Sequence, residues 1–134
     1  MKIPKAIIQS LDSEMITLCQ NAAKDIGMKM VKRNDLANFL LDLQENDYQV
    51  VLFDCKSMQV DCLNWIKVLR RTRPKIPLII ISDEVDREMG GRVYEEGTFY
   101  LCVPPIQKEL LQNIISAALT TYESRGRDQF RKTE

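Results

Sequence analysis

Residues 50–54 read Val-Val-Leu-Phe-Asp, an apolar run that ends abruptly in a carboxylate. A short continuous apolar run of this kind is typical of a strand buried on both faces of a sheet. Because burying the carboxylate of Asp54 would be costly, we expect it at the exit of the strand, where water reaches it and it can act as a ligand or nucleophile. Residues 55–59 are then predicted to form a loop. A helix follows, with four apolar residues at core spacing, namely Cys62, Trp65, Ile66 and Leu69.

Strand and helix patterns alternate on both sides of this stretch. Further strands are predicted at residues 5–10, 28–31, 76–82 and 99–102. The helices between them are expected to begin at Asp12 or Ser13, at Asn34 and at Asp83, and a last helix follows Pro105. Five strands alternating with five helices predict an α/β fold. We expect a three-layer (βα)5 doubly wound parallel sheet with right-handed crossovers and helices on both faces.

In sheets of this class the functional site lies beyond the carboxyl ends of the strands. That edge would gather Ser10, Leu11, Asp12, Asp54, Ser82 and the Val103-Pro104 turn. The predicted helix at residues 83–96 contains Gly90 and Gly91, each of which costs about 1 kcal/mol relative to alanine, so this helix should be weak or mobile. Residues 1–122 are expected to form one domain, and the polar residues 123–134 a fraying end or a linker stub.

Composition narrows the range of partners. The 134 residues include 19 basic and 19 acidic side chains, so no net field draws the chain to nucleic acid or to an anionic membrane. The cluster of Arg70, Arg71 and Arg73 is interpreted as the solvated end of a helix. Without a signal-type apolar run or a segment long enough to span a bilayer, the chain is expected in the cytoplasm.

The residue types present also exclude some chemistry. The sequence has no histidine, so we expect neither a histidine-dependent triad nor a zinc site. The four cysteines, Cys19, Cys55, Cys62 and Cys102, are scattered and form no Cys-x-x-Cys pair. We interpret them as small core residues in a reducing cytosol.

From about Lys5 to Ala118 the chain resembles the receiver domain of two-component response regulators. Val51-Leu52-Phe53-Asp54 matches the phospho-acceptor strand of that family, and Met58-Gln59-Val60-Asp61 matches the loop after it. The resemblance implies that Asp54 is the phospho-acceptor position and that Ser82 is the hydroxyl residue in contact with the phosphoryl group. It also implies that the strand order is the flavodoxin-like 2-1-3-4-5, that Tyr100 is the aromatic switch residue and that the bond before Pro104 is cis.

Two departures from the family pattern concern the chemistry itself. The acidic pair that holds Mg²⁺ in the family falls here on Ser10 and Leu11, and the lysine that pairs with the phosphoryl group falls on Val103. Asp12 is the one nearby carboxylate that could join Asp54 as a metal ligand. We therefore expect no cofactor, and Mg²⁺ only if the site is functional.

Each of three other positions has two possible interpretations. Lys56 could lean over the site and pair with Asp54 in place of the missing cation, or it could be a solvated loop lysine. Ser82 could contact a phosphoryl group or satisfy backbone groups at the end of a strand. Tyr100 could rotate between states or pack in the ordinary way with its hydroxyl in water.

These observations favour an atypical receiver domain in phosphorelay signal transduction, acting through protein contacts, with Asp54 kept in a degraded phosphorylation site. The alternative is a functional phospho-acceptor that receives its phosphoryl group on Asp54 from a histidine kinase. No enzymatic activity is expected beyond, at most, self-catalysed phosphoryl transfer to Asp54. A flavin or nucleotide binder is disfavoured, because residues 10–13 contain no glycine to cradle a phosphate.

The expected partners are signalling proteins, either a histidine kinase or a downstream effector. A homodimer through the helix at residues 83–96 and the last helix is a further expectation. The last helix has a second apolar face, made of Ile106, Leu110 and Ala117, which either forms an interface or covers the edge of the sheet.

Overall fold

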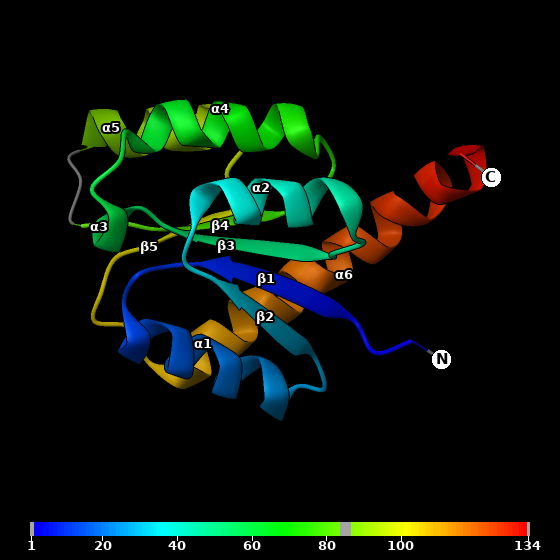
Figure 1. The fold of residues 1–134 in the computed structure, drawn as a ribbon, viewed down its shortest axis with the longest axis horizontal. Helices are drawn as coiled ribbons and strands as arrows, with labels where there is room; N and C mark the ends of the chain where they lie inside the picture. The colour runs from blue at the N-terminus through cyan, green and yellow to red at the C-terminus, as the bar shows by residue number, and fades with distance from the viewer. Residues whose placement is uncertain (1, 84–86, 134) are drawn as a thin grey trace.

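A five-stranded parallel sheet forms the middle layer of the molecule (Figure 1). The computed structural model describes residues 2–83 and 87–133, with side chains described as far as residue 125. The strands are β1 (Lys5–Gln9), β2 (Lys29–Arg33), β3 (Val50–Asp54), β4 (Leu78–Ile81) and β5 (Tyr100–Cys102). Their order, β2-β1-β3-β4-β5, confirms the predicted flavodoxin-like topology.

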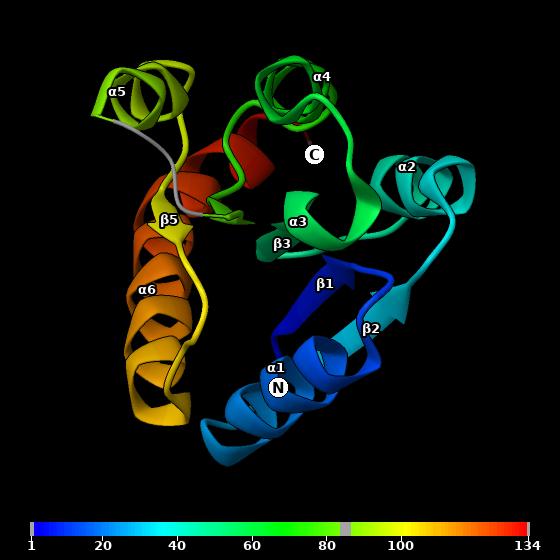
Figure 2. The same cartoon turned by 90° about the vertical axis from the view of Figure 1, so that its left-hand side faces the viewer.

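Helices cover both faces of this sheet (Figure 2). They are α1 (Ser13–Asp25), α2 (Leu36–Glu45), α3 (Cys55–Met58), α4 (Cys62–Thr72), α5 (Arg87–Glu95) and α6 (Lys108–Thr133). Helices α1 and α6 lie on one face, and α2, α4 and α5 lie on the other, which confirms the three-layer prediction. Among the described residues, no helix combines the length and apolar character needed to cross a bilayer.

The sheet separates two hydrophobic clusters. Successive strand residues point to opposite faces, so Ile8 and Leu52 pack in the cluster under α1 and α6, whereas Ile7 and Phe53 pack in the cluster under α2 and α4. All residues of β3 and β4 are buried. Burial on both faces explains why these two strands have continuous apolar sequences rather than alternating ones.

Aspartate side chains cap the N-termini of four helices, α1 to α4. Asp12 caps α1 and Asp61 caps α4, each accepting backbone N–H groups of the first turn. The prediction that Asn34 caps the second helix was wrong, because Asp35 is the cap and its carboxylate accepts the N–H of Asn38. Both residue types are good caps, so the sequence did not separate two neighbouring candidates.

The strand boundaries differ from the prediction by at most two residues, and three other segments differ more. Residues 55–59, predicted as a loop, include the one-turn helix α3. The helix predicted from Asp83 is helical from Arg87 to Glu95, and Glu84 and Val85, which were assigned to it, lie outside the described residues. The last helix continues to Thr133, so most of the segment expected to fray is helical.

Candidate functional site

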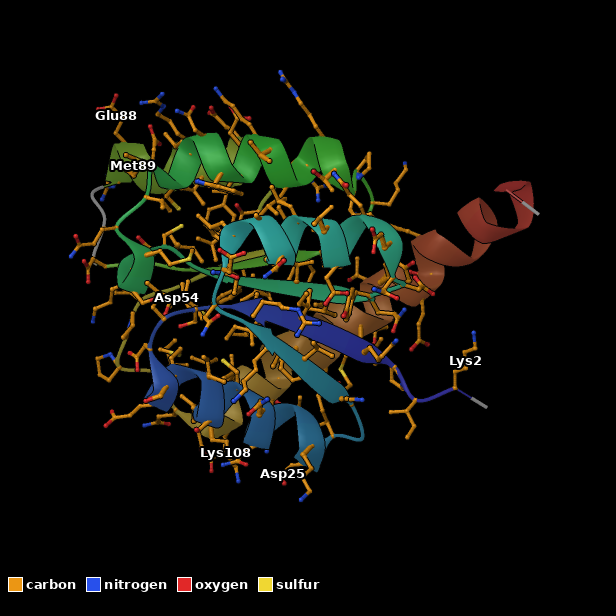
Figure 3. The ribbon with its side chains drawn as sticks, viewed as in Figure 1. Lys2, Asp25, Asp54, Glu88, Met89 and Lys108 are labelled. Atoms are coloured by element: carbon orange, nitrogen blue, oxygen red, sulfur yellow. The ribbon has the colours of Figure 1, made fainter. Side chains whose placement is uncertain are left out.

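The carboxyl ends of four strands bring the predicted site residues to one edge of the sheet. Asp54 ends β3 and lies opposite Ile81, whose other neighbour is Cys102. Ser10 follows β1 on the other side of β3. Ser82 and Val103 directly follow β4 and β5, so both also lie at this edge, where Figure 3 labels Asp54.

Asp54 is buried, with 1% of its surface exposed. Its Oδ2 accepts a hydrogen bond of 2.7 Å from the Ser10 hydroxyl, and its Oδ1 accepts the backbone N–H of Ser57 at 3.3 Å. The expectation that water reaches this carboxylate was wrong. The reason is local, because α3 begins directly after Asp54 and its first turn uses the carboxylate as an N-cap.

Two serine hydroxyls complete a hydrogen-bond network around the carboxylate. The Ser57 hydroxyl lies 3.3 Å from that of Ser10 and accepts the N–H of Leu11 at 2.9 Å. The Ser10 hydroxyl accepts the N–H of Asp12 at 3.0 Å while it donates to Asp54. The sequence analysis did not identify Ser57. The available signal was Asp54 itself, because aspartate is a common N-cap and its carboxylate then accepts the backbone N–H of the third residue after it.

The donor atoms near Asp54 do not fit a magnesium ion. Asp12, the expected second ligand, caps α1 by accepting the N–H groups of Glu14 and Met15 at 3.0 and 3.2 Å. Leu11 is 58% exposed and offers no side-chain oxygen. Among the described residues, no group of three or more Cys, Asp or Glu side chains could hold a metal ion. Mg²⁺ prefers an octahedron of hard oxygen ligands, which this edge of the sheet does not supply.

Lys56 does not pair with Asp54. Its Nζ lies 3.7 Å from the carboxylate of Asp83, and both side chains are exposed. Within the described part of the chain, no cationic group lies within ion-pair distance of Asp54. Lys56 is therefore a solvated lysine, and it does not take the place of the missing cation beside Asp54.

The remaining site positions lie along β4 and β5. The backbone N–H of Ser82 donates to the carbonyl of Cys102 at 3.0 Å, which continues the pairing of the two strands. Tyr100 and Val103 are exposed, at 37% and 40%. Sequence reasoning missed Tyr94, whose hydroxyl accepts the N–H of Leu101 at 3.0 Å and ties α5 to the edge strand.

The cis peptide bond was predicted one residue too early. It joins Pro104 to Pro105, not Val103 to Pro104. Two consecutive prolines provide two bonds at which the cis form is accessible, and the sequence pattern does not distinguish them. In the family the lysine directly precedes the proline of this turn. It would fall on Val103 if Pro104 is that proline and on Pro104 if Pro105 is, and neither residue carries a positive charge.

The arginine cluster at the end of α4 binds the chain itself. Arg70 donates to the carbonyl of Ile76 at 2.7 Å, and Arg73 donates to the carbonyl of Leu43 at 3.1 Å. Arg73 also pairs with Asp47 at 3.7 Å. The interpretation of this cluster as the solvated end of a helix was therefore wrong for Arg70 and Arg73, whose guanidinium groups bind backbone carbonyls, whereas Arg71 is exposed.

Comparisons with known proteins support the fold described above. No protein-family model matches the chain. A receiver domain protein of Methanospirillum hungatei, described as CheY-like, superposes with a TM-score of 0.81 at 14% identity, over 92% of this chain and 99% of the other. The chemotaxis response regulator CheY4 of Vibrio cholerae superposes with a TM-score of 0.76 at 16% identity, over 88% of this chain and all of the other. This chain has the receiver-domain fold.

One curated relative also matches the receiver-like chain by sequence. It is the DNA-binding transcriptional regulator NtrC of Proteus hauseri, 23% identical over 111 residues, or 83% of this chain. The match spans 24% of the length of NtrC.

Proposed function

We propose that this receiver-fold chain is a signalling domain of the cytoplasm that works through contacts with other proteins, without metal-dependent phosphorylation of Asp54. The observation that carries the proposal is the closed network at Asp54. Both carboxylate oxygens already accept hydrogen bonds, from Ser10 and from the backbone of Ser57. A phospho-acceptor needs an accessible oxygen to attack phosphorus, whereas 99% of the Asp54 surface is covered.

The electrostatics of the site support the same conclusion. Protein catalysis of phosphoryl transfer consists largely of positioning the group and stabilising the charge that develops on it. The turn after β5 supplies no cation at Val103 or Pro104, and Lys56 is engaged with Asp83. The chain therefore acts as an interaction module rather than as an enzyme.

An exposed apolar surface supports a role in protein contacts. Four large apolar or aromatic side chains of α5, β5, the following turn and α6 are exposed, namely Tyr94, Tyr100, Val103 and Leu110. Strand β5 forms this edge of the sheet, and α5 and α6 flank it on opposite faces (Figure 2). The second apolar face expected on the last helix is not continuous. Ile106 precedes α6 and packs against the core, whereas Leu110 and Ala117 are exposed. A histidine kinase, a downstream effector or a second copy of the chain would use this surface.

Incubation with acetyl phosphate and Mg²⁺, followed by intact-mass measurement, tests the proposal. We expect no adduct of about 80 Da, the mass of one phosphoryl group. A receiver domain that accepts phosphate, treated in parallel, verifies that the donor is active. An adduct on the wild-type chain that is lost in Asp54→Asn but kept in Asp61→Asn would contradict the proposal and identify Asp54 as a working phospho-acceptor.

A further inference from the structure

Two cysteine thiols approach each other beside the Asp54 network. Cys55 is the first residue of α3, and Cys62 is the first residue of α4. Their Sγ atoms are 2.7 Å apart, and both cysteines are free. A disulfide has a sulfur–sulfur distance of about 2.05 Å, so the two sulfurs need to move together by only about 0.7 Å to form one.

The two thiols differ in accessibility and in acidity. Cys62 is half-buried, whereas Cys55 is 5% exposed. The hydrogen bond donated by the Cys55 thiol lowers the pKa of Cys62, and the same hydrogen bond together with burial raises the pKa of Cys55. Cys62 also occupies the N-terminus of α4, where a helix stabilises negative charge. The more accessible thiol is thus also the better nucleophile.

We propose that Cys55 and Cys62 form a reversible intramolecular disulfide when the protein meets a peroxide. In the first step the Cys62 thiolate attacks one oxygen of hydrogen peroxide, the O–O bond breaks, and sulfenic acid and hydroxide result. In the second step the Cys55 sulfur attacks the Cys62 sulfur, the S–O bond breaks, and water leaves. In total two thiols and one peroxide give one disulfide and two waters, so the sulfurs lose two electrons and the peroxide gains them.

The other two cysteines are not suited to this reaction. Cys19 and Cys102 are 0% and 3% exposed and belong to the hydrophobic cluster on the opposite face of the sheet. Burial raises the pKa of both thiols, to about 11 for Cys102. Peroxide should therefore oxidise the Cys55 and Cys62 pair before either of the others.

The disulfide would also constrain the surroundings of Asp54. It would join the first residue of α3 to the first residue of α4 and close the segment that contains Ser57. Ser57 donates its N–H to Asp54, and its hydroxyl accepts the N–H of Leu11. The crosslink would therefore restrict movement of the segment that shields the Asp54 carboxylate from solvent. The disulfide itself does not depend on the function proposed above.

Peptide mapping of the folded protein tests this inference. The reduced chain is treated with hydrogen peroxide, the peroxide is removed, the protein is unfolded in excess alkylating agent so that all remaining free thiols are capped, and the product is digested with trypsin. Because Lys56 separates the two cysteines, cleavage yields residues 34–56 and 57–67 as separate peptides. We expect the loss of two of the four thiols, a decrease of about 2 Da in intact mass, and a linked pair of these peptides that separates on reduction.

Cysteine variants provide the controls. Cys62→Ser should abolish the crosslink, whereas Cys19→Ala should leave it unchanged. Unlinked peptides with oxygen added to Cys62, a crosslink to Cys19 or Cys102, or a disulfide-linked dimer would each overturn the inference. The wild-type peptide map decides the question even if one variant fails to fold.

Discussion

The Ser10 hydroxyl donates a 2.7 Å hydrogen bond to Oδ2 of Asp54, joining the end of β1 to the end of β3 inside the molecule. Serine here occupies one of the two positions at which the resemblance leads one to expect a carboxylate. A carboxylate there would repel Asp54 unless a cation lay between them, whereas a hydroxyl binds it directly. The hydroxyl of Ser10 therefore satisfies Oδ2 of Asp54 with a neutral hydrogen-bond donor.

Replacing Ser10 with alanine should destabilise the fold. Asp54 would remain buried with its Oδ2 deprived of a donor, and hydrogen bonds to charged groups contribute about 1.5–3 kcal/mol. Urea denaturation at neutral pH should show this decrease in the free energy of unfolding. Ser116→Ala makes the same chemical change at an exposed position of α6 and should alter the stability by less than about 0.5 kcal/mol. Equal effects of the two substitutions would contradict the importance of the Ser10 hydrogen bond.

Introducing the acidic pair should create a dependence on Mg²⁺ that we do not expect of the wild-type chain. In a Ser10→Asp, Leu11→Asp variant, two new carboxylates would adjoin Asp54, and a divalent cation that binds the folded state would stabilise it. Thermal unfolding with MgCl2, compared with NaCl at equal ionic strength, should raise the Tm of the variant by a few degrees. The Tm of the wild-type chain should not change, and a rise there would show that its own donor atoms do bind the metal.

The sheet was predictable from sequence for a physical reason. Strands β3 and β4 are buried on both faces, so each has to be apolar almost throughout. A short apolar run such as Val50 to Phe53 is therefore most readily interpreted as a buried strand. The alternation of strands and helices then predicted a parallel sheet covered on both faces, whereas the order of its strands came from the resemblance to receiver domains. The same logic brought Ser10 and Asp54 to one edge of the sheet, because their strands are neighbours.

The local geometry of the site was less predictable. A one-turn helix such as α3 is too short for hydrophobic periodicity, so residues 55–59 were interpreted as a loop and the burial of Asp54 was missed. The approach of Cys55 to Cys62 depends on a turn in which Gln59 adopts a φ of 53°. Residues other than glycine adopt this conformation uncommonly, and nothing in the local sequence signals it.

The stability of the protein should fall at high pH in a way that depends on Tyr48. Burial, together with a 2.8 Å hydrogen bond to Asp42, raises the pKa of Tyr48 from 10.0 to about 12. The folded state therefore keeps a proton that the unfolded state loses, and this contribution is complete below about pH 10 and lost as the pH approaches about 12. Urea denaturation at about pH 9 and about pH 11.5 should show a smaller decrease for Tyr48→Phe than for wild type. Identical pH dependence in both proteins would contradict the assignment.

Asp42 should be among the most sensitive polar residues of the fold. Its buried carboxylate accepts hydrogen bonds from Asn46 at 2.7 Å and from Tyr48 at 2.8 Å, and it pairs with Arg33 at 2.7 Å. Asp42→Ala would leave the buried Tyr48 hydroxyl without its acceptor, and we expect a loss of about 2–3 kcal/mol because the arginine is partly exposed and can be hydrated.

Asp47 provides the matched control for that substitution. It also pairs with an arginine, Arg73, but at 3.7 Å and with half of its side chain exposed. Exposed ion pairs contribute about 0–1 kcal/mol, so Asp47→Ala should have the smaller effect in the same denaturation experiment. If Asp47→Ala were as destabilising as Asp42→Ala, charge alone would account for both effects. A larger effect at Asp42 would instead assign the stabilisation to the buried hydrogen bonds between α2 and the segment that leads into β3.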